Sequence, residues 1–161
     1  MALGDITLYS EQAHGITGGL KANVAASATL IYAGEPVTHA LGGAAVTPMA
    51  TNKPVVATDY LEGVAITTST NTASVAGEVT VAPINPSDVW LIAPKVAATW
   101  DTQAEYDALV GDRVLLDLTS TAYTILATDG ATYGCVIRPL DISKHPGMVA
   151  FSFRAGCNYL A

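Results

Sequence analysis

Charged side chains are scarce in this chain of 161 residues, in which Asp, Glu, Lys and Arg make up only 13% of the sequence. An ordinary soluble domain carries about 25%. Because half of the residues are hydrophobic, Ala, Thr, Ser, Gly and Asn must supply most of the surface. A surface of this composition suits packing against other protein better than dispersal in water, and it predicts a subunit of an assembly.

The chain also lacks a basic cluster, a long apolar run and a targeting signal. Its seven basic residues are scattered and its formal charge is −7, which argues against nucleic acid as a partner because phosphate binding needs a clustered basic face. The longest charge-poor stretch, residues 64–81, is interrupted by Thr, Ser and Asn, whereas a membrane-spanning helix needs roughly 20 predominantly apolar residues. The N-terminus has no positively charged region before an apolar run, so we expect synthesis in a cytoplasm without a secretory signal.

Only two cysteines are present, Cys135 and Cys157. They are too few for a zinc site, which takes four ligands in paired spacing. A cytoplasmic origin favours two free thiols that are mostly buried, because free cysteine behaves as a small hydrophobic residue. A disulfide between them is the alternative.

Motifs of catalysis are missing as well. The sequence contains no G-x-S-x-G elbow, phosphate loop, H-E-x-x-H or G-x-G-x-x-G motif. His14, His39 and His145 lack the spacing of metal ligands and are interpreted as surface residues. Asp112 is interpreted as the polar residue of a helix–strand junction, and Asp117 as a solvent-facing strand residue. We therefore expect no enzyme, and no catalytic, cofactor-binding or metal-binding residue.

Short β-type runs, rich in Val, Ile, Thr and Tyr and bounded by Gly, Pro, Asn or Asp, recur along the chain. The predicted strands are Ala28–Tyr32, Pro36–His39, Ala44–Pro48, Pro54–Thr58, Gly63–Thr68, Glu78–Ala82, Val89–Ala93, Arg113–Leu118, Ala122–Ala127, Gly134–Pro139 and Met148–Arg154. Many short strands at this spacing predict a mainly β fold, an antiparallel sandwich or barrel.

One short helix is predicted from Thr102 to Val110. Thr102 and Glu105 have the spacing of a capping box, in which each side chain accepts a hydrogen bond from the backbone amide of the other residue. Gly111 is placed for the C-terminal cap.

Two kinds of turn are predicted from local sequence. Asp129-Gly130 is typical of a hairpin turn. The pentapeptides that begin at Ala33 and Ala76 share the sequence Ala-Gly-Glu, in which Gly supplies the backbone angle of a tight turn and Glu begins the next strand.

The first nineteen residues differ from the rest, because a single candidate strand, Ile6–Tyr9, is followed by Gly15 and Gly18-Gly19. This pattern predicts an N-terminal arm, residues 1–19, joined by a glycine hinge to a β domain, residues 20–161. An edge strand folded into the body is the alternative. The β domain is either one sandwich or two lobes, about 20–83 and 88–161, joined by the proline-punctuated residues 83–88.

Aromatic residues are interpreted as parts of the core. Trp90 and Trp100 are expected to be core anchors and not a sugar-stacking platform. In the last strand, Val149, Phe151 and Phe153 alternate with smaller or polar residues, which predicts one buried and one exposed face. Arg154 is expected on the exposed face.

Several short motifs follow one another along the chain: residues 20–29, 32–37, 45–48, 60–65 and 77–81. Their order resembles the head decoration, or capsid cement, proteins of tailed bacteriophages, in which a Gly-Glu/Asp-x-Val turn opens the β domain and a Gly-Val/Ile-Ala strand lies at its centre. Residues 100–109, 111–118 and 145–154 also look like such proteins.

The resemblance implies a virion structural protein without catalytic activity. Proteins of this family bind the outside of an assembled capsid, often as trimers at three-fold or quasi-three-fold positions, and tie neighbouring capsomers together. The implied partners are the major capsid protein and further copies of this chain in a homotrimer, with no nucleic acid, membrane or cofactor. The implied location is the capsid exterior, after assembly in the host cytoplasm.

Candidate partner-binding residues come from the chain itself and not from the family. They are Ile6, Leu8 and Tyr9, because an arm can add a strand to an exposed sheet edge, and Arg154. Two alternative functions remain, of which the first shares the composition and the second would need exposed aromatic residues in a groove. One is another phage assembly part, such as a tail-tube or head–tail joining subunit, and the other is a carbohydrate- or receptor-binding β module of a fibre.

Overall fold

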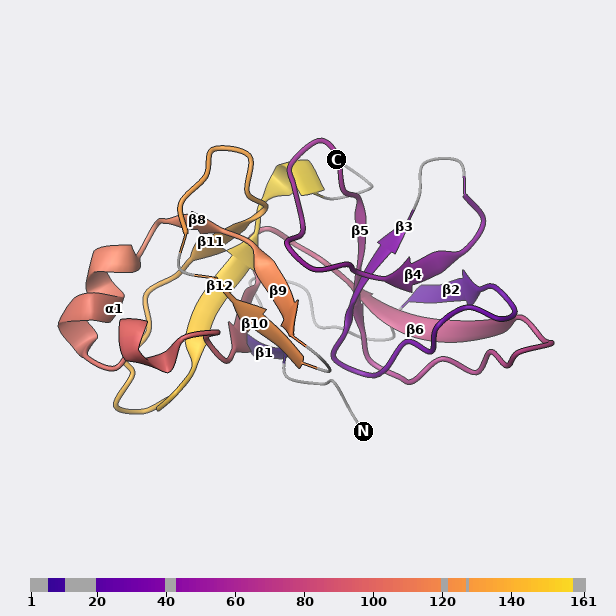
Figure 1. Ribbon diagram of the computed structural model, residues 1–161, viewed down its shortest axis with the longest axis horizontal. Coiled ribbons are helices and arrows are strands. Elements are labelled where there is room, and N and C mark those ends of the chain that lie inside the picture. The colour runs from indigo at the N-terminus through magenta and orange to yellow at the C-terminus, as the bar shows by residue number, and fades with distance from the viewer. Residues whose placement is uncertain (1–5, 11–19, 40–42, 120–121, 127, 158–161) are drawn as a thin grey trace.

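The computed structural model describes residues 6–10, 20–39, 43–119, 122–126 and 128–157 (Figure 1). Within them the fold is mainly β, with antiparallel sheets, one of them curled into a half-barrel, and one short α-helix. The predicted fold class is therefore confirmed. His14 and the predicted glycine hinge lie outside the described residues.

Residues 20–83 build the first sheet, which lies on the right in Figure 1 and has the spatial order β2-β6-β5-β3-β4. Its antiparallel strands are β2 (Leu20–Val24), β3 (Pro36–His39), β4 (Val46–Pro48), β5 (Leu61–Ala65) and β6 (Gly77–Pro83). Their inward side chains are small and apolar, so the curled sheet encloses a compact core of Val24, Ile31, Val37, Val46, Ala65, Val79 and Val81.

The second sheet lies on the left in Figure 1 and has the order β1-β7-β12-β11-β8. Its antiparallel strands are β1 (Thr7–Ser10), β7 (Val89–Ile92), β8 (Arg113–Val114), β11 (Cys135–Ile137) and β12 (Val149–Phe153). A separate antiparallel pair is formed by β9 (Leu116–Thr119) and β10 (Ala122–Ile125). Two single 3₁₀ turns, η1 and η2, span Ala97–Thr99 and Ala155–Cys157.

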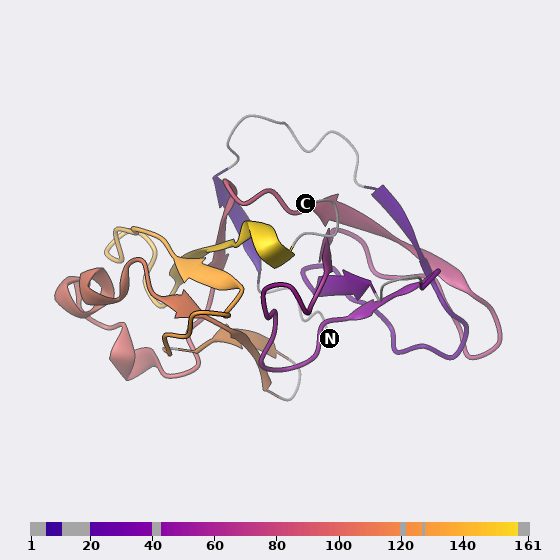
Figure 2. The same cartoon turned by 90° about the horizontal axis from the view of Figure 1, so that it is seen from above.

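The predicted helix is confirmed as α1 (Gln103–Leu109), and both hydrogen bonds of its capping box are present at Thr102 and Glu105. Tyr106 anchors the helix, because its side chain is fully buried and its hydroxyl donates to the Arg138 carbonyl at 2.8 Å. The Tyr106 hydroxyl also accepts from the amide of Ala150 at 2.9 Å. Burial raises the pKa of Tyr106 to about 12, so this phenol stays protonated and keeps donating at neutral pH. Both views place α1 at the end of the molecule farthest from the first sheet (Figures 1 and 2). No helix in the described part of the chain is long and apolar enough to cross a membrane.

The two sheets share one larger core. Most of its residues come from the second sheet and its surroundings, including the predicted anchors Trp90 and Trp100, which are 3% and 5% exposed. Residues of the first sheet and its flanks also belong to it: Met49, Leu61, Val64, Ala82 and Ile84. The halves on either side of residues 83–88 are therefore packed together by apolar contacts.

A connecting segment after β4 crosses from the first half to the second. Lys53 and Leu116 exchange backbone hydrogen bonds of 3.2 and 2.8 Å, and Val55 bridges to Tyr133. Residues 54–58, predicted as a strand, are therefore held by isolated bridges and turns. The segment lacks a continuous partner strand, so it cannot propagate a ladder.

Other sequence predictions about strands are wrong or incomplete. Residues 28–32 form no strand, because the side chains of Ser69 and Asn71 bond their backbone in place of a ladder. The strand β2 was not predicted at all. The Asp129-Gly130 hairpin is absent, since β10 pairs with β9 and Asp129 instead accepts a hydrogen bond from the amide of Arg113 at 3.0 Å.

The last strand, β12, does not have the predicted exposed face. It lies in the middle of the second sheet, between β7 and β11, and all five of its residues are buried. Ser152, expected outside, donates to the Asp88 carbonyl at 2.7 Å. Sequence alternation cannot distinguish a half-exposed strand from one that other chain segments cover on both sides.

Candidate functional site

The chemically reactive residues do not come together. Among the described residues, no group of three or more His, Cys, Asp and Glu side chains could hold a metal ion. Cys135 and Cys157 are free and buried, as the first of the two sequence readings predicted, and burial raises the pKa of both thiols. His39 ends β3, and its Nδ1 lies 4.0 Å from a Glu62 carboxylate oxygen. His145 lies in the turn before β12.

Asp112 and Asp117 occupy different environments. Asp112 lies at the junction of α1 and β8, as predicted. The prediction for Asp117 is wrong, because this residue is only 6% exposed. Its carboxylate accepts from the Thr51 hydroxyl at 2.8 Å and lies 2.8 Å from Lys95 Nζ. Asp117 is therefore a structural link between the two halves.

The structure describes the side chains of two of the four candidate partner-binding residues, Ile6 and Arg154. Strand β1 pairs with β7, and Ile6 is buried in the main core, so residues 6–10 follow the alternative prediction of an edge strand folded into the body. The side chains of Leu8 and Tyr9 lie outside the part of the chain that the structure describes. Arg154 is half-buried, and its guanidinium donates to the carbonyls of Ala131 and Tyr133 at 2.9 and 2.7 Å. A role of these residues in partner binding stays a prediction.

A different surface stands out, which we call the neutral face. It consists of residues 20–31 and 66–80, which lie side by side because β2 pairs with β6 and Ser27 donates its amide to the Thr72 carbonyl at 3.0 Å. These 27 residues contain only two charged side chains, Lys21 and Glu78. The rest of the exposed residues on this face are Ala, Thr, Ser, Asn, Leu, Ile and Val.

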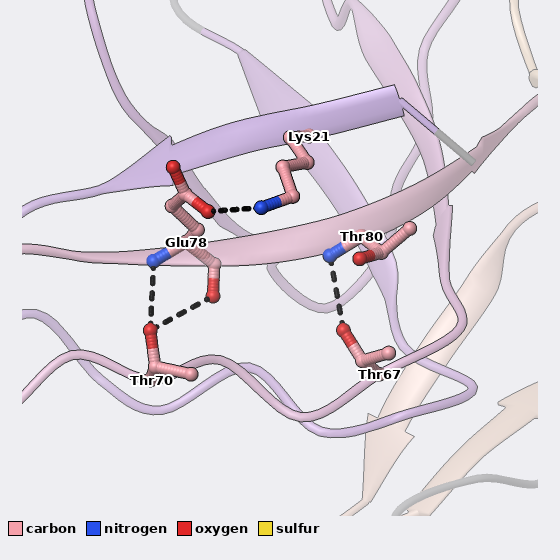
Figure 3. Close-up of polar contacts among 5 residues, drawn as sticks. All are labelled: Lys21, Thr67, Thr70, Glu78 and Thr80. Atoms are coloured by element: carbon pink, nitrogen blue, oxygen red, sulfur yellow. Dashed lines mark hydrogen bonds and ion pairs between the residues drawn. The ribbon is translucent and has the colours of Figure 1, made fainter. Parts of the chain in front are cut away.

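The two charged side chains of the neutral face neutralise each other in an ion pair. Lys21 Nζ lies 2.9 Å from a Glu78 carboxylate oxygen across the β2–β6 pair (Figure 3). The hydrogen bond and charge of Glu78 raise the pKa of Lys21. Both side chains are exposed, so solvent screens the pair and its contribution to stability is small. Its consequence is that the face carries no net charge.

Threonine hydroxyls extend the sheet where β5 ends. Beyond Ala65 the chain continues beside β6, and the Thr67 and Thr70 hydroxyls accept from the amides of Thr80 and Glu78, each at 3.0 Å (Figure 3). The backbone of this segment also bonds β6, since the Ile66 amide donates to the Thr80 carbonyl at 2.8 Å. These hydroxyls replace the carbonyls of a regular ladder, so the amides of Glu78 and Thr80 are satisfied within the chain.

Two strands of this sheet are preceded or opened by a glycine, and the two glycines are needed for different reasons. Gly77 opens β6, where a Cβ atom would lie 2.1 Å from the amide nitrogen of Asn71. Gly34, in the related Ala-Gly-Glu turn, has a φ of 89°, which a side chain disfavours. The adjoining glutamates also differ, because Glu35 is buried and Glu78 is exposed. The shared Ala-Gly-Glu sequence therefore leads into a strand twice, but the predicted turn angle is present at Gly34 and not at Gly77, which already belongs to β6.

Four large apolar side chains are exposed within the two segments of the neutral face. They are Leu20 at 50%, Leu30 at 38%, Ile66 at 45% and Val75 at 61% of their full exposure. Single exposed apolar residues are ordinary. Several of them on a face without net charge are typical of protein–protein contacts, whose centres are depleted of charge. The sequence pattern indicated the low charge of residues 64–81 but did not predict β2, which places Leu20 and Lys21 beside β6.

Comparison with known proteins adds no relative. No protein-family model matches the chain, and no curated protein or solved structure matches it.

Proposed function

We propose that this chain is a structural subunit of a tailed-bacteriophage capsid that binds the outer surface of the assembled shell and stabilises it by bridging capsomers. The observation that carries this proposal is the neutral face. Burying such a face against protein removes apolar area from water while desolvating few charges. An assembly subunit benefits from this property, whereas a dispersed monomer does not. The resemblance of the sequence motifs to decoration proteins supports the phage context.

Self-association through the neutral face is part of the same proposal. β2 is an end strand of the first sheet, and among the described residues it pairs with β6 alone. An end strand with one ladder partner, beside exposed apolar residues, favours symmetric contact with further copies of the chain. We propose a homotrimer, which forms either in solution or on the shell, where binding supplies the local concentration.

The buried tryptophans bear on one alternative function. A carbohydrate-binding groove would need exposed aromatic residues as stacking platforms, but Trp90 and Trp100 both belong to the core. This placement favours the capsid proposal over a receptor-binding module. A tail-tube or head–tail joining subunit makes a different prediction about assembly products, which the following experiment tests.

The decisive experiment combines purified protein with expanded shells isolated from particles that lack it, followed by electron cryomicroscopy. The proposal predicts added density on the outer surface at three-fold or quasi-three-fold positions, and shells that withstand higher temperature. Rings or tubes formed by the protein would support a tail part. Shells that remain bare at saturating protein would contradict the proposal.

A variant tests the neutral face directly. Val75→Glu places a charge on its most exposed apolar residue and should reduce oligomer or lattice formation without unfolding the subunit, because the side chain is 61% exposed. Thr132→Glu, at an exposed site outside the face, is the matched control. Analytical ultracentrifugation and shell pelleting measure the two effects. Equal association of both variants with the wild type would show that another surface mediates assembly.

A further inference from the structure

A second surface, at the opposite end of the molecule from the first sheet, combines an apolar pocket with unpaired negative charge. The pocket has a volume of about 200 Å³ and is formed by residues of the two segments that precede α1 and β12 in the sequence. Its lining includes Pro94, Ala97, Trp100, Asp101, Ile142 and Met148. Val96, next to the pocket in sequence, is 56% exposed. The pocket is large enough for one apolar side chain and is open to the outside.

Several carboxylates in and next to α1 form no ion pair with a described Lys or Arg side chain. None of the described Lys or Arg side chains pairs with Asp101, Glu105, Asp107 or Asp112. Asp101 is part of the pocket wall, and its pKa is raised because its carboxyl shares a hydrogen bond with Glu105 and is repelled by it. A cation from outside would relieve this repulsion. The charge at the pocket rim therefore complements a basic partner.

All seven Lys and Arg side chains already have a partner within the subunit. Five of its seven basic side chains form ion pairs within the subunit: Lys21, Lys53, Lys95, Arg113 and Lys144. Arg138 donates to Ser152 Oγ at 3.0 Å, and Arg154 donates to two backbone carbonyls. A second copy would have to break an existing contact to pair with Asp101, which favours a different protein as the occupant.

Trp100 supplies the aromatic part of the pocket wall. This residue is 5% exposed, and its indole N–H has no hydrogen-bond partner among the described residues. A buried donor without an acceptor costs free energy. The nitrogen itself is buried, so Trp100 presents apolar surface to the pocket, which suits an apolar side chain as the occupant.

We propose that this pocket docks an apolar side chain of the shell protein, next to a Lys or Arg that pairs with Asp101 and Glu105. The inference rests on the proposed function, because it assigns the partner on that basis. It places shell binding at the α1 end and self-association at the neutral face, which lies at the other end (Figures 1 and 2). A subunit with two separate contact surfaces can connect neighbouring capsomers.

Charge variants test the rim. Asp101→Asn/Glu105→Gln keeps the side-chain shapes and leaves Gln as a competent residue of the capping box. The control, Glu62→Gln/Asp129→Asn, removes the same number of carboxylates away from the pocket. In pelleting assays with shells that lack the protein, we expect the first variant to bind about tenfold more weakly and with less dependence on salt. Equal affinities and salt dependences for wild type and both variants would overturn the inference.

Steric variants test the pocket. Ala97→Trp fills it from an exposed wall position, whereas Ala98→Trp adds the same bulk at the exposed neighbour that does not line it. Only the first should weaken shell binding, with unchanged thermal unfolding for both. A photo-crosslinking residue at position 97 should capture a shell-protein peptide that contains Lys or Arg beside an apolar residue. Capture of another copy of this chain would overturn the inference. If wild-type protein binds no shells at all, it is the proposed function that fails.

Discussion

Tyr123 of β10 donates its hydroxyl proton to the backbone carbonyl of Met49, and this bond joins two segments 74 residues apart. Tyr123 is fully buried, and burial raises the pKa of its phenol well above the usual range, so the donor stays protonated. Met49 follows β4 of the first sheet, and its side chain belongs to the shared core. The two halves are therefore connected by a buried polar contact in addition to apolar packing.

Removing this donor should weaken the whole subunit. Tyr123→Phe leaves the Met49 carbonyl buried without its partner, and we expect the free energy of unfolding to fall by about 1–3 kcal/mol. Tyr133→Phe, at a partly exposed position, should change it by less than about 0.5 kcal/mol. Urea unfolding followed by fluorescence measures both. A Tyr123→Phe protein as stable as the wild type would show that this bond contributes nothing.

Glu35 should make stability depend on pH in an unusual direction. Glu35 is 2% exposed, and its carboxyl accepts a hydrogen bond from the Tyr32 amide at 2.6 Å, but burial dominates and raises its pKa. The folded protein therefore retains this proton at pH values where the unfolded chain has released it. The Glu35 contribution to stability is complete below the ordinary pKa of 4.5 and declines as pH rises through the folded-state pKa.

Glu35→Gln separates this contribution from those of other titrating groups. The amide oxygen can still accept from Tyr32, and the charge is gone. We expect the variant to be more stable than the wild type at pH 7 and to approach it at pH 4. Unfolding free energies at several pH values measure the difference between the two proteins. A difference that stays constant with pH would mean that the Glu35 pKa is the same in both states.

Phe151 should be one of the most sensitive core positions. Its ring is fully buried and lies edge-to-face with Phe153, with ring centroids 5.1 Å apart. Phe151→Ala should destabilise the protein by about 3–5 kcal/mol through lost packing and a cavity. Phe151→Leu, which refills part of the volume, should cost less. Calorimetric unfolding tests the order, and an unchanged midpoint for the alanine variant would be inconsistent with this core.

Ile6 distinguishes an edge strand from a detached arm. In the structure its side chain is 5% exposed within the main core, so Ile6→Ala should lower the free energy of unfolding of the isolated subunit by about 2–5 kcal/mol. Val75→Ala, at an exposed position, should have little effect. If Ile6→Ala leaves thermal unfolding unchanged and weakens only oligomerisation or shell binding, residues 1–10 act as an arm.

Local features of the sequence were sufficient for the helix and for most strands. The capping box at Thr102 and Glu105 involves residues three apart, so its hydrogen bonds need no distant partner. Runs of β-branched and aromatic residues located β6, β7 and β10 to within two residues at either end. The low charge of the chain likewise predicted a surface suited to contact, and the neutral face is where the structure concentrates it.

The sequence by itself determined the β class, the one capped helix and the aromatic core, because these follow from propensity and from short-range contacts. Only the tertiary structure decided how the strands pair, that β12 is covered on both faces and that Asp117 is buried beside Thr51 and Lys95. It also decided that Asp101 meets an apolar pocket formed in part by residues more than forty positions away. These features depend on contacts between distant segments, and no local pattern specifies which segment will cover a given face.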